Sequence, residues 1–163
     1  MKVMSSRATV PRSSRYQYTI ILTGLLLLFC GRVLAQLIQA WSPVTFLPPF
    51  TAWASGALPY WLLVLCQILI IVACARVIWR LHQGLMIPSV TTGKVLLLLG
   101  SVYFGLMCVR LIIGLTVAAD HFWLSARLPT VFHFVLAGFV LVCGWFHYKA
   151  SDAGHSRGPG ETA

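Results

Sequence analysis

Two arginines stand inside apolar stretches of this sequence, and an arginine guanidinium is well suited to binding an anion. Arg32 lies in LLLLFCGRVLAQLI (residues 25–38), and Arg110 lies in FGLMCVRLIIGLT (residues 104–116). An arginine within a membrane helix costs at least about 2.5–3.5 kcal/mol on insertion scales. A buried charge that costs this much free energy indicates a functional role, and this chain contains two such arginines.

Three more polar side chains fall at a similar depth of the apolar stretches: Gln36, Gln67 and His133. Gln36 is one turn from Arg32 on the same helix face. At a rise of about 1.5 Å per residue, both arginines lie about 9–10 Å inside the same membrane face. Lipid offers no hydrogen-bond partners, so these groups must face one another inside the protein. We therefore expect these five residues to form one polar layer that binds a ligand or partner.

The positive charges in this layer have few candidate counter-ions. The apolar stretches contain no Asp or Glu, and Asp120 is the one acid expected on that side. The arginines could extend to the membrane surface, bind an anionic or quinone-like head group from lipid, quinone or substrate, or pair with acidic residues of another protein. Their matched depth on two helices favours a binding role over an accident of sequence.

Two histidines on one predicted helix raise the question of haem. His133 and His147 are fourteen residues apart, so they share a face about 21 Å apart. This spacing resembles that of the paired axial histidines of membrane b-type cytochromes, although the resemblance covers one helix only. His82 and His121 lie at opposite membrane edges and make no regular second pair. Haem b bound with the help of a partner or a second copy is kept as an alternative.

Motifs for other chemistry are missing from the sequence. It has no Gly-rich phosphate loop, no HExxH, no GxSxG and no paired carboxylates. None of the five cysteines forms CxxC, and all five lie in apolar runs, where small buried thiols commonly pack. With three acidic residues in total, catalysis by carboxylates inside a bilayer is disfavoured. We expect no enzymatic activity and no metal site.

The elements that position these residues follow from composition. The chain has 163 residues, 59% hydrophobic and 9% charged, with mean hydropathy +0.87. Soluble domains carry about 25% charged residues, so the composition predicts a polytopic membrane protein. A span needs about 20 helical residues. The prediction is an all-α, four-helix transmembrane bundle over residues 18–150, with spans 18–38, 60–79, 95–117 and 129–148, a basic segment 1–17 and a disordered cytoplasmic tail 151–163.

Positive residues predict the orientation, because they favour the cytoplasmic side. Nine lie beside one set of span ends and only Arg127 beside the other; the nine are Lys2, Arg7, Arg12, Arg15, Arg76, Arg80, Lys94, Lys149 and Arg157. Both termini are therefore expected in the cytoplasm, with the polar layer on the outer side. The net charge of +9 is interpreted as contact with anionic lipid rather than nucleic acid. Size and charge bias suggest a bacterial inner membrane.

Span 1 also has a second interpretation. Its basic start, apolar run and Val33-Leu34-Ala35 could form a cleavable signal peptide. Arg32 directly before the cleavage point argues against this, and so does a possible internal repeat. Cys30-Gly31-Arg32 in the first span matches Cys108-Val109-Arg110 in the third, and the second and fourth spans both open with Leu-Pro. Two interpretations of this match stay open, two tandem helical hairpins or a chance resemblance between short apolar segments. The loop 41–59 is uncharged and rich in aromatic residues, as expected for an interfacial anchor or a lid.

These observations favour a small accessory or binding protein of the membrane. Its outer polar layer would hold an anionic or quinone-like head group, or acidic residues of a larger complex. The expected partners are membrane lipids and another membrane protein or a second copy of the chain. Two alternatives stay open, a redox component that binds haem b or quinone and a small transporter subunit. A polar layer confined to one side favours binding over transport.

Overall fold

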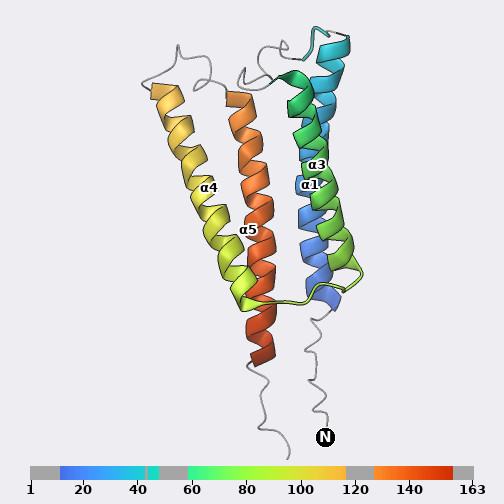
Figure 1. Cartoon of the computed structure of the whole chain (residues 1–163), viewed down its shortest axis with the longest axis vertical. Helices are drawn as coiled ribbons and strands as arrows, with labels where there is room; N and C mark the ends of the chain where they lie inside the picture. The colour runs from blue at the N-terminus through green and yellow to red at the C-terminus, as the bar shows by residue number, and fades with distance from the viewer. Residues whose placement is uncertain (1–11, 43, 48–58, 117–126, 156–163) are drawn as a thin grey trace, which may run out of the picture.

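The computed structural model describes residues 12–42, 44–47, 59–116 and 127–155. They form four helices, α1 (Arg12–Trp41), α3 (Tyr60–His82), α4 (Val90–Thr116) and α5 (Arg127–His155), without a strand in the described part (Figure 1). Each helix contains a segment long and apolar enough to cross a membrane. The predicted all-α class with four such helices is confirmed.

The helices are longer than the apolar stretches. α1 already begins at Arg12, inside the predicted basic segment, and α5 runs on to His155, five residues into the predicted tail. The extension has a local cause, because helical hydrogen bonds form within the segment and do not stop where the apolar residues stop. Residues 1–11, 43, 48–58, 117–126 and 156–163 lie outside the described residues, and with them Asp120, His121, most of the aromatic loop and the remaining tail.

α5 is the central helix of the arrangement. Its backbone lies beside α4 on one side and α1 on the other, and α3 packs on α1 (Figure 1). The start of α1 and the end of α5 lie at the same end of the structure, as an even number of antiparallel helices requires. We call this the terminal end and the opposite one, where α1 and α4 end and α3 and α5 begin, the loop end.

The core lies toward the terminal end, between α1, α3 and α5. It contains Leu22, Leu81, Phe139, Cys143 and Phe146. The aromatic rings of Tyr18 and Phe146 meet edge to face there, with their centroids 5.3 Å apart. Outside the core, the outward faces of α3 and α4 expose many large apolar side chains, as is typical of helices that face lipid.

α4 and α5 approach each other through glycines. A Cβ added to Gly93 would lie 2.7 Å from the backbone nitrogen of Tyr148, and one added to Gly144 would lie 2.9 Å from the nitrogen of Leu97. Both distances are shorter than side chains tolerate, and the neighbouring atoms are backbone. Small residues allow such backbone contact between membrane helices, so these glycines fix the separation of α4 and α5.

Candidate functional site

The predicted polar residues lie in the interior near the loop end. The exposed fraction is 8% for Arg32, 1% for Gln36, 4% for Gln67 and 9% for Arg110, and His133 is half-buried. α1, α3, α4 and α5 thus each contribute at least one member. Because both arginines are buried, the structure does not show them extended to the surface.

Between α1 and α3 the layer contains a pair of glutamines. Nε2 of Gln67 donates a hydrogen bond to Oε1 of Gln36 over 3.1 Å. The other halves of the two amides, Nε2 of Gln36 and Oε1 of Gln67, are buried without a hydrogen-bond partner in the described residues. An unsatisfied buried polar group costs about 1–3 kcal/mol. The pair therefore offers one donor and one acceptor to a further polar group.

Between α4 and α5 the layer contains a tyrosine and a histidine. The hydroxyl of Tyr103 and Nδ1 of His133 are hydrogen-bonded over 2.6 Å, and the two rings meet edge to face with centroids 6.0 Å apart. Tyr103 is not among the site residues predicted from the sequence. The signal was its spacing, because Tyr103 precedes Arg110 by seven residues, which places both on one helix face two turns apart.

The two halves of the layer meet around His133. Arg32 from α1 and Arg110 from α4 both interact electrostatically with this histidine, and Arg110 also interacts with Tyr103. The guanidinium carbon of Arg32 lies 5.3 Å from the ring centroid of Phe132, a contact also absent from the predicted site and within cation–π range. Three helices thus gather two permanent positive charges about one imidazole.

Arg32 retains hydrogen-bonding capacity inside this cluster. Its Nε is buried and has no hydrogen-bond partner among the residues described. The one carboxylate in the described part of the chain, Asp152, follows His133 by nineteen residues on α5, which is about 28 Å along the helix. The interior layer therefore holds directed donors and positive charge without an acid from the described helices.

The predicted histidine pair is divided between two environments. His133 takes part in the hydrogen bond with Tyr103, whereas His147 is buried toward the terminal end with Nδ1 lacking a hydrogen-bond partner in the described residues. His82 is exposed at the end of α3, and His121 falls outside the described part. Over that part, no three His, Cys, Asp or Glu side chains gather in a way that could hold a metal ion.

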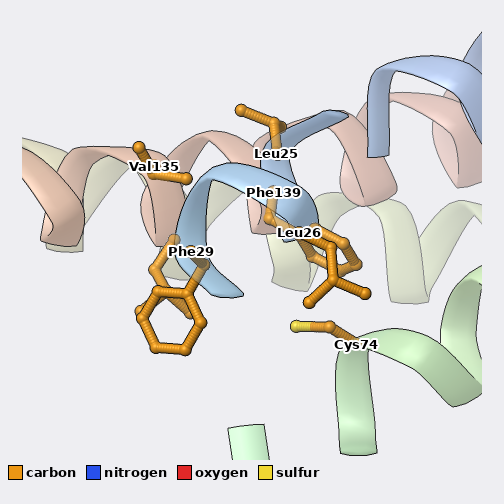
Figure 2. Close-up of a pocket in the computed structure, with 7 residues that line it drawn as sticks. Leu25, Leu26, Phe29, Cys74, Val135 and Phe139 are labelled. Atoms are coloured by element: carbon orange, nitrogen blue, oxygen red, sulfur yellow. The ribbon is translucent and has the colours of Figure 1, made fainter. Parts of the chain in front are cut away.

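A small apolar cavity borders α1, α3 and α5 deeper in the structure. Figure 2 shows Leu25, Leu26 and Phe29 from α1, Cys74 from α3, and Val135 and Phe139 from α5 around it; Leu136 completes the lining. Its volume is about 10 Å³, enough for about one water, but a stable water needs polar partners that this lining lacks. This part of the interior provides no polar path toward the terminal end.

The arrangement has the positive charge and the donors to bind an anionic group, and amides that can orient it. No family model, curated protein or solved structure matches the chain. Its function is therefore inferred from these side chains.

Proposed function

We propose that this chain is a small multi-pass membrane binding protein whose polar layer holds the anionic or quinone-like head group of a ligand, or acidic residues of a larger membrane complex. The observation that carries the proposal is the convergence of buried Arg32 and Arg110 on His133. Positive residues at the opposite span ends favour cytoplasmic termini, which would place the layer in the outer leaflet of a bacterial inner membrane.

The charges favour an anion over a neutral ligand. The sequence supplies one acid, Asp120, near this end of the helices, against two arginines. Even if that acid neutralised one arginine, one positive charge would remain for a ligand or partner. Nε of Arg32 and Nε2 of Gln36 add unfilled donors, and hydrogen bonds from a cation to an anion are about twice as strong as neutral ones.

Native mass spectrometry of the full-length protein, gently extracted from its own membrane, tests this function. We expect the wild type to retain a lipid, a quinone or an acidic partner protein. The double variant Arg32→Gln/Arg110→Gln should insert normally and lose that component. The matched control Arg76→Gln/Arg80→Gln removes the same charge from exposed positions of α3 and should retain it. Equal retention in both double variants would contradict the proposal.

A redox role is the second candidate, favoured by the buried His147, whose Nδ1 has no hydrogen-bond partner among the described residues, and by its shared helix face with His133. An absorbance spectrum of the same sample decides between the two. Haem b would give a Soret band that disappears in His133→Ala. A transporter subunit is less favoured, because the cavity in Figure 2 is lined by apolar side chains.

A further inference from the structure

A second cavity, lined by polar side chains, lies at the terminal end between the first turns of α1 and the end of α3. Its volume is about 460 Å³, and its lining consists of Arg15, Tyr16, Thr19, His82 and Gln83. Ligand sites in proteins measure about 300–1,000 Å³. Arg15 precedes Arg32 by seventeen residues of one helix, about 26 Å along its axis, so this cavity is separate from the polar layer.

The turn after α3 shapes one wall of this cavity. Gly84 has φ +70°. Its N–H donates a hydrogen bond to the carbonyl oxygen of Leu81 over 3.1 Å, and the N–H of Leu85 donates one to the carbonyl oxygen of Arg80 over 2.9 Å. This pattern is the glycine-terminated end of a helix, which requires a positive φ. A Cβ on Gly84 would overlap Nη1 of Arg15. The glycine therefore ends α3 and also leaves room for the Arg15 guanidinium against the turn.

The groups that line the cavity are suited to a phosphate. Arg15 supplies a permanent charge, and its Nε is buried with no hydrogen-bond partner in the described chain. The phenol of Tyr16, the imidazole of His82 and the amide of Gln83 add further donors, and none of the described residues that line the cavity carries a carboxylate. Arginine matches the geometry of phosphate oxygens with several N–H groups at once.

An apolar stripe continues from the cavity along α1. Tyr16, Ile20 and Leu27 follow one another at spacings of four and seven residues, which places them on one helix face. Their exposed fractions are 62%, 53% and 65%. A polar cavity at the end of an exposed apolar stripe follows the order of a lipid, whose polar head group lies at the membrane surface and whose acyl chains would lie along the helix.

We propose that this cavity binds the phosphate of an anionic phospholipid in the leaflet on the side of the termini. The proposal goes beyond the function of the polar layer and rests on the four helices crossing a membrane. Free phosphate shares the recognised chemistry, so the experiment must separate the two sources.

The test measures the thermal stabilisation of the full-length protein in neutral detergent by dioctanoyl phosphatidylglycerol, dioctanoyl phosphatidylcholine and inorganic phosphate. We expect phosphatidylglycerol to stabilise the wild type at the lowest concentration. Arg15→Gln should weaken this binding roughly tenfold or more, the expected loss for a hydrogen bond to a charged group. Arg15→Lys, which keeps the charge, should recover part of it, and His82→Gln should weaken it as an independent variant.

A matched control variant separates binding in the cavity from attraction to general surface charge. Arg76→Gln removes one exposed charge from α3 outside the cavity and should bind like wild type; an equal loss there would overturn the site in favour of general surface charge. Unchanged binding in both Arg15→Gln and His82→Gln would also overturn it. Stabilisation by inorganic phosphate alone, lost in Arg15→Gln, would overturn the lipid as ligand. Stabilisation by phosphatidylglycerol that is lost in Arg15→Gln and kept in Arg32→Gln/Arg110→Gln would assign the lipid to this cavity, whereas the reverse pattern would assign it to the polar layer and overturn this proposal.

Discussion

The two helical hairpins of the molecule, α1–α3 and α4–α5, each contain a polar pair inside an apolar surrounding, but their helices pack differently. Each carries a Cys-x-Arg and one hydrogen bond between polar side chains of its two helices. α4 and α5 touch backbone to backbone at Gly93 and Gly144, whereas a Cβ at Gly24 or Gly31 of α1 would meet nothing within 4 Å. The same residue type therefore sets the interhelical distance in one hairpin and leaves an open surface in the other.

The polar pairs also differ in their position relative to the arginines. α1 and α4 run in the same direction (Figure 1), yet Arg32 precedes Gln36 by one turn and Arg110 follows Tyr103 by two turns. Arg32 and Arg110 lie at similar distances from the ends of their predicted spans, whereas Gln36 and Tyr103 lie on opposite sides of their arginines along the helix. A tandem duplication stays a prediction, and its signal is the Cys-x-Arg motif rather than the polar pairs.

The largest contrast between the hairpins is expected from glycine substitutions. Gly93→Ala and Gly144→Ala should each destabilise the protein by about 1–3 kcal/mol, because the added methyl group must push backbones apart. The controls Gly24→Ala and Gly31→Ala should be neutral or stabilise by up to about 1 kcal/mol through helix propensity. Equilibrium unfolding in mixed micelles measures all four. Similar losses in both sets would remove the distinction between the hairpins.

A smaller effect is expected from Tyr103→Phe, which removes the hydroxyl from the α4–α5 pair and keeps the ring. We expect a loss of about 1 kcal/mol, within the range up to about 1.7 kcal/mol found for hydrogen bonds between membrane helices. The same unfolding assay on Tyr103→Phe, His133→Phe and the double variant gives the coupling energy. Strict additivity would show that the short Tyr103–His133 contact contributes nothing of its own.

The smallest effect is expected in the α1–α3 pair. Gln67→Leu should cost about 0.6 kcal/mol, the average for such bonds, because the amide of Gln36 then loses its partner. Adding Gln36→Leu should restore the lost stability, since neither amide then remains buried without a partner. Ligand retention should nevertheless fall in the double variant if the unfilled amide groups contact the ligand. A double variant less stable than both single variants would indicate a structural role for the pair.

The five polar residues of the layer stand out in the sequence as polar groups within apolar runs, but the residues that contact them do not. Tyr103 and Phe132 escaped notice because aromatic side chains are ordinary members of an apolar span, and their roles depend on which neighbour faces them. The Arg15–His82 cavity escaped for a related reason, since its walls come from the first turns of one helix and the last turn of another. Spacing within one helix does not reveal such a meeting.

By itself, the sequence determined the number of helices and the position of each polar group along its helix, although the helices extend beyond the predicted spans. These follow from the apolar runs and from a constant rise per residue, both properties of a single helix. The tertiary structure alone decided that α5 lies at the centre, that Arg32 and Arg110 both interact electrostatically with His133, and that Arg15 lies against the turn at Gly84. Such contacts depend on how each helix is rotated and how closely backbones approach, and apolar faces directed toward lipid leave that rotation undetermined until small residues and polar pairs select it.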